Sequence, residues 1–299
     1  MDILKEVEDK LSILKGIYDI IRIIDPINKK LIDVSDDKLL AQNESCFGFW
    51  SRGPFCENCI SMRAYLENDT FVKVENSSGK VFLVTAMPIK INDNTYVLEI
   101  LKDISKSEDF SKKSKGTKDD LEVLTRKINE KVITDSLTGI YNKSYINERL
   151  PFDMNKASIK GEPISIIMAD IDLFKNINDS YGDIIGDKVI EDFAKLIKKT
   201  LREDTHWVGR YEGEKFLIVL GGTDSEGAYN IAESIRLKLE NTNFKYENAD
   251  IRITSSFGVH SINNFKLDLH GFISGANENL YKAKQLGRNK TVIDKQKKI

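Results

Sequence analysis

Apolar residues near the start of the chain recur at spacings of three and four, which is the period of an amphipathic helix. They are Ile3, Val7, Leu11, Leu14 and Ile17. Short β-prone runs then alternate with turn residues, and they predict two strands, a polar stretch and a three-stranded meander. These runs cover residues 20–24, 30–34, 70–74, 80–87 and 96–101. The pattern therefore predicts an α+β domain over residues 1–105 that begins with a helix.

A polar, lysine-rich segment follows over residues 105–120, where Phe110 is the one apolar residue, and this composition indicates a linker. Apolar residues then return in a narrow seam, at Leu121, Leu124, Ile128 and Val132. A seam this thin, surrounded by lysine and glutamate, favours a two-stranded coiled coil over a helix that packs on its own domain. We therefore expect residues 106–134 to form a linker and stalk, and the 118–134 stalk to make the protein a parallel homodimer.

The second half of the chain alternates between helical and strand-like patterns. The runs that predict strands are 163–169, 216–220, 251–259 and 291–293, and those that predict helices are 189–201, 228–239 and 272–285. This alternation predicts a second α+β domain over residues 135–299. A chain of 299 residues is long enough for two domains that each bury a core.

Charged side chains gather beside two of the predicted buried strands. The segment 210–220 reads R-Y-E-G-E-K-F-L-I-V-L, which predicts a tight hairpin with charged residues at its tip, followed by a buried strand. Asp170 and Asp172 stand at the end of the 163–169 strand, and hard carboxylate oxygens suit Mg²⁺. These two places are the first candidates for a functional site.

Composition narrows the class of protein. The chain is 40% hydrophobic and 31% charged, with a formal net charge of -2, so no basic excess indicates a nucleic-acid partner. The N-terminus is acidic and amphipathic, and no apolar run approaches the roughly 18 residues that a membrane span needs. We expect a cytoplasmic protein with no membrane partner.

Three cysteines follow the pattern C-x9-C-x2-C, at Cys46, Cys56 and Cys59. A C-x2-C pair on a turn can bring two thiolates to one metal, and the third cysteine could complete three ligands of a zinc site or of an iron–sulfur cluster. The alternative is three reduced, inert thiols packed around a helix. The first 200 residues contain no histidine that could act as the fourth ligand.

Three motifs in the second domain resemble the GGDEF family, the diguanylate cyclases. Residues 135–143 read D-S-L-T-G-I-Y-N-K, which resembles the start of that domain, and residues 170–187 resemble its D-x-D-x-F-K-x-I-N-D-x-x-G-H-x-x-G-D motif, with Asp183 replacing the histidine. The hairpin reads E-G-E-K-F at 212–216, where the family has G-G-(D/E)-E-F. The resemblance implies the family's palm-like cyclase fold, a central β-sheet flanked by helices.

The resemblance also implies roles for individual residues. Asp170 and Glu214, with the Ile171 carbonyl, match the groups that hold Mg²⁺ or Mn²⁺ on GTP. Asn178 and Asp187 match the guanine-binding residues, and a carboxylate can accept from both donors on the guanine edge. The remaining nucleotide contacts lie at the phosphates: Phe174 and Lys175 in the phosphate loop, and Lys284 and Arg288, which are four apart and which we expect on one helix face.

Two positions of the hairpin depart from the family motif. In the family, two GTP-loaded domains face each other, and the glutamate at the fourth motif position ligates a metal and deprotonates the attacking hydroxyl. That position is Lys215, and a protonated lysine can do neither. At the first position Glu212 replaces a glycine and places an anion near the triphosphate. The catalytic positions to consider are therefore Glu212, Glu214 and Lys215, and Glu212 could alternatively supply the missing acid.

The family's product-inhibition motif R-x-x-D is absent, because residues 203–206 read E-D-T-H. The first domain, with two strands, a helical middle and a three-stranded meander, resembles a PAS sensor. The sequence thus predicts a PAS–GGDEF signalling protein that binds GTP, makes little or no cyclic di-GMP and regulates an unidentified downstream protein. The alternatives are an active diguanylate cyclase, an altered GTP-using cyclase or triphosphatase, and a structural dimer with a vestigial nucleotide site.

Overall fold

The computed structural model describes residues 18–35, 38–50, 56, 58–77, 79–91, 94–105, 131–202, 205–246, 249–263 and 268–294. The chain divides into two compact units, Met1–Val132 and Ile133–Ile299. The predicted N-terminal helix, the linker and all of the 118–134 stalk before residue 131 lie outside the described residues. The coiled coil and the domain limits drawn from the sequence therefore stay predictions.

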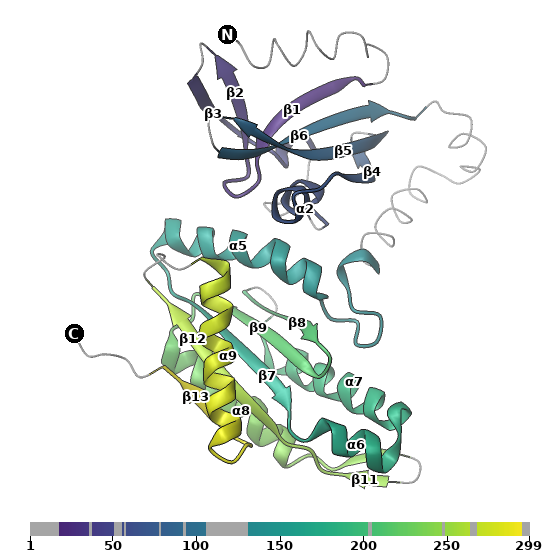
Figure 1. The fold of residues 1–299 in the computed structure, drawn as a ribbon, viewed down its shortest axis with the longest axis vertical. Coiled ribbons are helices and arrows are strands. Elements are labelled where there is room, and N and C mark those ends of the chain that lie inside the picture. Colours follow the sequence, from purple (N-terminus) through teal and green to yellow (C-terminus); the bar gives the residue numbers. More distant parts are fainter. Residues whose placement is uncertain are drawn as a thin grey trace. The chain divides into compact units, whose positions relative to one another are not determined.

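The first unit is built on a six-stranded antiparallel sheet with the order β3-β2-β1-β6-β5-β4 (Figure 1). Its strands are β1 (Ile20–Asp25), β2 (Lys30–Ser35), β3 (Lys38–Ser45), β4 (Phe71–Ser77), β5 (Lys80–Ile91) and β6 (Asn94–Asp103). A short 3-10 helix, η2 (Gly48–Trp50), and the helix α2 (Ile60–Glu67) lie between β3 and β4 in the sequence. All five strands predicted for this half of the chain are present.

The strand β3 was not predicted, because its residues 38–45 carry few apolar side chains. It lies at the edge of the sheet, where one side of the strand needs no partner and a polar sequence is tolerated. Burial in this unit centres on α2, whose Ile60 and Ala64 are one helical turn apart and pack with Val84 and Ala86 of β5. One helix thus covers part of the sheet.

The second unit is built on a five-stranded sheet with the order β13-β12-β7-β9-β8. Its strands are β7 (Ile164–Ile171), β8 (His206–Glu212), β9 (Lys215–Gly221), β12 (Ser255–Ile262) and β13 (Thr291–Ile293). The helices that accompany it in the described part of this unit are α5 (Lys143–Lys160), α6 (Phe174–Tyr181), α7 (Asp183–Thr200), α8 (Ser225–Glu240) and α9 (Leu269–Gln285). The short strands β10 (Phe244–Tyr246) and β11 (Ala249–Ile251) form a separate pair.

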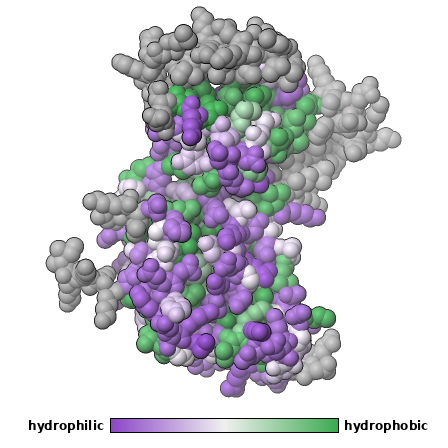
Figure 2. Space-filling model, in the orientation of Figure 1, coloured by the Kyte–Doolittle hydropathy of each residue, from purple (hydrophilic) through white to green (hydrophobic). Residues whose placement is uncertain are grey.

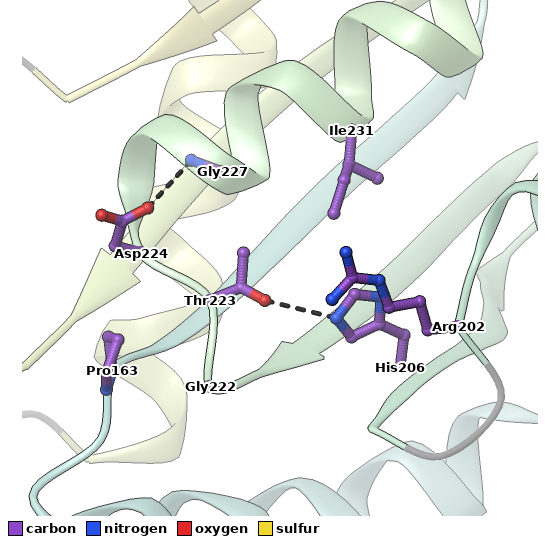
Figure 3. Close-up of a pocket in the computed structure, with 8 residues that line it drawn as sticks. All are labelled: Pro163, Arg202, His206, Gly222, Thr223, Asp224, Gly227 and Ile231. Atoms are coloured by element: carbon purple, nitrogen blue, oxygen red, sulfur yellow. Dashed lines mark hydrogen bonds between the residues drawn. The ribbon is translucent and has the colours of Figure 1, made fainter.

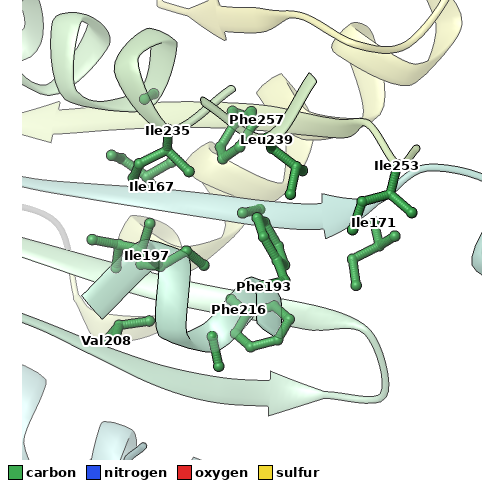
Figure 4. Packing of buried hydrophobic residues seen from close by; sticks show 14 of the residues in the cluster. Ile167, Ile171, Phe193, Ile197, Val208, Phe216, Ile235, Leu239, Ile253 and Phe257 are labelled. Atoms are coloured by element: carbon green, nitrogen blue, oxygen red, sulfur yellow. The ribbon is translucent and has the colours of Figure 1, made fainter. Parts of the chain in front are cut away.

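The central strand β7 is buried along its whole length because helices cover both faces of the sheet. Successive side chains of a strand point to opposite faces. Ile167 and Ile171 pack with Phe193 of α7 and with α8 (Figure 4), whereas Ile166 and Met168 pack with α5 and α9. This two-sided burial explains why β7 is mostly apolar, with Ser165 and Asp170 as its polar residues.

Several element boundaries differ from the prediction. The run 251–259 was expected to be one strand, but β11 ends at Ile251 and β12 begins at Ser255. The helix expected at 272–285 begins earlier, at Leu269, because the Asp268 carboxylate caps it by accepting from the Gly271 N–H at 2.7 Å. The last strand was predicted at 291–293, and β13 has these bounds.

The surface of the second unit, on the face drawn in Figure 2, is mostly hydrophilic with scattered apolar side chains. Within the described ranges, no helix has the length and apolar character needed to cross a membrane. Isolated exposed apolar residues are ordinary in water-exposed surfaces, and examples here are Ile159 and Ile184, at 81% and 75% exposure.

Candidate functional site

Asp170 lies near the end of β7 and is 1% exposed. It pairs with Lys215 of β9 on one side and with Ser256 of β12 on the other. Its backbone carbonyl accepts a hydrogen bond from the Ser255 hydroxyl at 2.8 Å. The central strand therefore holds this carboxylate at the end of the sheet where β7 finishes, next to the turn that joins β8 and β9.

The Lys284 ammonium, on α9, lies 2.7 Å from Oδ2 of Asp170. Burial raises the pKa of the Asp170 carboxyl; Lys284 opposes this shift, and the nearby Glu214 carboxylate adds to it. The lysine expected to contact phosphate and the acid expected to hold metal are thus brought together from opposite ends of the domain sequence.

The signature hairpin consists of β8, a turn at Gly213 and Glu214, and β9. Glu212 and Lys215 face each other across the strands. The Lys215 ammonium donates to Glu212 Oε1 at 2.9 Å, and the Lys143 ammonium lies 3.6 Å from Glu212 Oε2. Glu212 is therefore engaged by two lysines at the edge of the site.

These contacts favour the charged forms of both Glu212 and Lys215. The hydrogen bond from Lys215 lowers the pKa of Glu212, and the same bond raises the pKa of Lys215. Asp170 and Glu214 also favour the charged form of Lys215. At neutral pH the hairpin therefore presents an ammonium group where the family motif has a glutamate.

An arginine that sequence analysis did not identify connects the hairpin to the start of the domain. Arg210 Nε donates to the Gly213 carbonyl at 2.7 Å, and its Nη1 lies 3.2 Å from Asp135 Oδ1. Asp135 Oδ1 also accepts from the Thr138 N–H at 3.0 Å. The D-S-L-T segment thus supports the hairpin turn through Arg210. The sequence feature that could have identified this residue is an arginine shortly before the hairpin tip.

The two predicted guanine-binding residues lie on consecutive helices. Asn178 is on α6, Asp187 is exposed on α7, and Gly182 connects the two helices. A Cβ on Gly186 would lie 1.9 Å from Asn178 Oδ1, so the sequence needs glycine there for α7 to approach Asn178. Among the described residues no donor satisfies the buried Asn178 Oδ1, which leaves an acceptor for a ligand.

Phe174 and Lys175 begin α6, directly after the carboxylates of 170–172. Phe174 is partly buried against the core, and Lys175 is exposed. The structure thus brings the predicted phosphate-loop residues to the same end of β7 as Asp170.

The expectation that Lys284 and Arg288 share one helix face is wrong. The helix α9 ends at Gln285, and Arg288 lies in the turn that follows, in a left-handed conformation with φ 63°. Gly287, with φ 107°, precedes it and ends the helix as glycine commonly does. Lys284 lies in the last turn of α9, whereas the position of Arg288 is set by the backbone of the non-helical turn that follows.

Comparison with known proteins identifies the second unit. Residues 132–290, more than half of the chain, match the family model of the diguanylate cyclase GGDEF domain. The chain belongs to the GGDEF diguanylate cyclase family. It is 39% identical over 171 residues to Diguanylate cyclase A of Treponema denticola, a match covering 56% of this chain and 45% of that protein.

A second relative is the response regulator PleD of Caulobacter vibrioides, which is 33% identical over 165 residues, covering 54% of this chain and 36% of PleD. The chain therefore spans less than half the length of these curated relatives. Their names concern whole proteins that are longer than the segment they share with this one.

Solved structures support the fold of the GGDEF domain. The GGDEF domain of DgcB from Caulobacter crescentus, in complex with c-di-GMP, matches with a TM-score of 0.52 and 28% identity over 54% of this chain and 95% of that one. The diguanylate cyclase SiaD of Pseudomonas aeruginosa, in complex with its activator SiaC, matches with a TM-score of 0.54 and 27% identity over 64% and 73% of the two chains.

Family members use Mg²⁺ or Mn²⁺ with GTP, and the donor set of this GGDEF domain fits such an ion. Asp170 Oδ1 is buried and has no hydrogen-bond partner among the described residues. The Glu214 carboxylate is close enough to raise the pKa of Asp170. Two nearby carboxylates, one of which has a buried oxygen without a partner, supply the hard oxygen ligands that a divalent cation requires.

The described residues offer no support for a zinc or iron–sulfur site at Cys46, Cys56 and Cys59. Within them, no group of three or more His, Cys, Asp or Glu side chains is arranged to hold a metal ion. None of the three cysteines forms a disulfide bond in the described part of the chain. Burial raises the pKa of Cys56 to about 11 and raises that of Cys46 as well, so both are protonated at neutral pH. Metal ligation requires thiolates.

A cavity of about 460 Å³ opens at the other end of β7, away from Asp170. Its lining residues are Pro163, Arg202, His206, Gly222, Thr223, Asp224, Gly227 and Ile231 (Figure 3). His206 Nε2 lies 3.2 Å from the Thr223 hydroxyl, and burial, together with Arg202, lowers the pKa of this imidazole. The cavity contains none of the residues predicted to bind nucleotide.

Proposed function

We propose that this chain is a signalling protein whose GGDEF domain binds GTP with Mg²⁺ and synthesises little or no cyclic di-GMP. In this proposal GTP occupancy regulates a downstream protein. The proposal rests on family membership, on the geometry around Asp170 and on the Lys215–Glu212 ion pair of the neighbouring hairpin. Because the chain spans less than half of its curated relatives, the activity of the whole protein is part of the proposal.

The proposed binding residues supply complementary chemistry for each part of GTP. Asp170, Glu214 and the Ile171 carbonyl would hold the cation, which would neutralise phosphate charge. Asn178 and Asp187 would accept from the guanine donors. Lys284 and Arg288 would bind the terminal phosphates through charge-assisted hydrogen bonds, with Phe174 and Lys175 at the phosphate loop.

The observation that carries the proposal is the Lys215–Glu212 ion pair. A charged ammonium cannot accept the proton of an attacking hydroxyl or ligate a second cation. Glu212 is the other candidate base, but its pKa is lowered and Lys215 donates to it at 2.9 Å. A carboxylate stabilised as an anion is a weaker base, so the hairpin retains binding groups and lacks an efficient proton acceptor.

Lys215 also has a proposed binding role. Its partner across β7 and β9 is Asp170, and both Asp170 and Glu214 favour its charged form. The ammonium would therefore supply positive charge at the place where family members bind a second cation. GTP would then bind with one metal ion instead of two.

A second candidate function is that of an active diguanylate cyclase or another GTP-using cyclase or triphosphatase. Glu212 favours it, because its side chain is 52% exposed and lies on the same hairpin as Glu214. Rotation of an exposed side chain costs little, so a bound substrate could draw Glu212 into the site. Diguanylate cyclase A of Treponema denticola, at 39% identity, supports the same alternative.

The first unit would act as the sensor. Its order of three strands, a helix and a three-stranded antiparallel meander supports a PAS-like domain over residues 1–105, with β3 as an additional edge strand. In this proposal residues 106–134 form the linker and stalk, residues 135–299 form the GGDEF domain, and the 118–134 stalk joins two copies. Cys46, Cys56 and Cys59 have a packing role.

The proposal is tested by measuring binding and turnover on the same preparation. Calorimetry with Mg²⁺ should show GTP binding in preference to ATP, and chromatography after incubation with Mg²⁺ or Mn²⁺ should show little cyclic di-GMP. Asp187→Ala should weaken GTP binding by about 1–3 kcal/mol, because a guanine donor pair loses its acceptor. Glu191→Ala removes an acid from the same helix and should leave binding unchanged.

Two results would contradict the proposal. Equal affinity for GTP and ATP in the unmodified protein would contradict the assignment of GTP as the preferred nucleotide. Rapid formation of cyclic di-GMP, or of another GTP product, would replace the regulator with the second candidate function.

A further inference from the structure

Asp172 is the second acid of the D-x-D motif, and its contacts differ from those of Asp170 at the proposed cation site. It follows β7 directly and is 7% exposed. Its backbone N–H donates to the Thr254 carbonyl at 2.9 Å, which attaches it to the segment before β12. A buried carboxylate is costly unless hydrogen-bond donors surround it, so its partners indicate its role.

Three donors engage the two oxygens of the Asp172 carboxylate. Oδ1 accepts from the Ser256 hydroxyl at 2.6 Å. Oδ2 accepts from the Thr254 hydroxyl at 2.9 Å and from the backbone N–H of Asn289 at 2.9 Å. The third of these bonds joins residues that are far apart in the sequence and belong to different elements.

Asn289 lies in a turn with an unusual backbone conformation. Gly287, Arg288 and Asn289 all have positive φ, at 107°, 63° and 47°. A positive φ in a residue with a side chain is uncommon and persists where the surroundings hold it. The Arg288 N–H donates to the Ala283 carbonyl at 3.1 Å, so α9 holds one side of the turn and Asp172 holds the other.

The Asn289 side chain provides a second attachment. Its Oδ1 accepts from Arg236 Nη1 at 3.1 Å, and its Nδ2 donates to Glu240 Oε1 at 2.7 Å, both on α8. Arg288 itself is exposed. The backbone next to Arg288 is therefore fixed to the end of β7 and to α8, while its side chain projects outward.

We infer that Asp172 is a positioning residue for nucleotide binding: it clamps the Gly287–Asn289 turn and so fixes where Arg288 meets the terminal phosphates. This inference rests on the proposed function, because it assigns Arg288 to the phosphates of GTP. It divides the D-x-D motif into two roles: Asp170 faces the cation, and Asp172 shapes the turn that carries the phosphate ligand.

The clamp predicts a selective loss of affinity. Asp172→Ala removes the acceptor of the Asn289 N–H, so the left-handed turn loses its anchor on β7 and Arg288 is no longer preorganised. We expect GTP affinity to fall about 10- to 100-fold, the range for one charged hydrogen bond. Arg288→Ala should cause a similar loss. Affinity for GMP, which lacks the terminal phosphates, should stay unchanged in both variants.

Asp172→Asn is the matched conservative variant. Its amide oxygen can still accept from Asn289 N–H while its amide nitrogen donates to the Ser256 hydroxyl. It should therefore retain GTP affinity within a few fold, whereas loss of a cation ligand would weaken Mg²⁺-dependent binding. The Asp172→Ala, Arg288→Ala double variant should be no weaker than either single variant, because both changes remove the same contact.

Hydrogen–deuterium exchange of the full chain tests the Asp172 clamp in the absence of nucleotide. Asp172→Ala should speed exchange of the Asn289 amide, and Ser256→Ala, which leaves the Asn289 bond in place, should not. An equal fall in GTP and GMP affinity, additive effects in the double variant, or unchanged exchange at Asn289 would overturn the clamp. Failure of the unmodified protein to bind GTP would instead overturn the proposed function, and the exchange result would still decide whether Asp172 holds the turn.

Discussion

Two substitutions in the hairpin compensate each other at the scale of single residues. Lys215 stands where the GGDEF motif has an acid, and Glu212 stands where it has a glycine. Each would be unfavourable alone, since Lys215 adds a cation beside a cation site and Glu212 adds an anion beside phosphate. Together they form an ion pair of 2.9 Å and cancel each other's charge. In our proposal, this pair allows the modified hairpin to keep a site for GTP.

We predict that Glu212→Gly together with Lys215→Glu, which restores the family motif, raises cyclic di-GMP formation about a hundredfold or more. Metal stabilisation of transition-state charge contributes several kcal/mol, and each 1.36 kcal/mol is tenfold in rate. Lys215→Glu alone should give little product, because Glu212 then loses the nearer of its two lysine partners and lies with Glu214 and the new Glu at the hairpin tip. Product chromatography with Mg²⁺ measures both.

The two single effects should not add to that of the double variant, because both residues act on one triphosphate. Wild-type turnover that the double variant does not improve would contradict the regulator proposal. It would make Glu212 the candidate catalytic acid.

At the scale of elements, the site depends on how closely α9 packs on the sheet. Lys284 reaches Asp170 from the last turn of α9, and α9 crosses β12 at Gly258. A Cβ on Gly258 would lie 2.2 Å from the Ala276 carbonyl oxygen and 2.1 Å from the Leu280 nitrogen. Both neighbours are backbone atoms, which cannot move aside as a flexible side chain would.

Gly258→Ala should therefore push α9 away from β12. We expect it to lower the free energy of unfolding by about 1–3 kcal/mol, the usual cost of overpacking, and to weaken GTP binding by displacing Lys284. Gly221→Ala is the control, since its added Cβ would lie 3.2 Å from the Thr205 carbonyl oxygen, at the opposite end of the sheet from Asp170. Urea denaturation and calorimetry measure the two effects; an equal effect of both variants would contradict the role of α9.

At the scale of the whole molecule, the chain joins two units of different construction. The first is an antiparallel sheet with α2 on it, and the second is the GGDEF domain. The family reaction, in which two GTP-loaded domains face each other, requires two copies of the domain. A sensor that controls this reaction would also need two copies of the chain. The apolar seam at Leu121, Leu124 and Ile128 is the sequence feature that favours such pairing.

We predict that Leu124→Glu with Ile128→Glu converts a homodimer into a monomer, because two charges per chain cannot be buried in a narrow apolar seam. Sedimentation equilibrium measures the mass, against a 34.0 kDa chain. Glu122→Lys with Glu130→Lys changes two charges outside the seam and should leave the dimer intact. A wild-type monomer, or a dimer that survives the seam change, would contradict the stalk.

Much of the fold was predictable because periodicity reports burial. The apolar run of β7 and the alternating runs of β5 and β6 each indicated their strand, since a buried strand must be apolar on the faces it covers. The strand β3 escaped prediction because an edge strand can remain polar. The ends of β12 and α9 were misplaced because single residues such as Asp268 decide where an element begins.

The amino-acid sequence alone was sufficient to assign the GGDEF family, because motif residues keep their order and spacing along the chain. The same motifs are the basis for the predicted binding roles of Asp170, Glu214, Asn178, Asp187, Lys284 and Arg288. It could not show the pairing of Lys284 with Asp170, the ion pair that joins Glu212 to Lys215, or the contact of Asp172 with the turn at Asn289. These contacts join residues from different elements, and their distances arise when β7, β9 and α9 pack into one sheet-and-helix core. Packing therefore separates two neighbouring acids: Asp172 accepts from the turn at Asn289, whereas Oδ1 of Asp170 has no hydrogen-bond partner among the described residues.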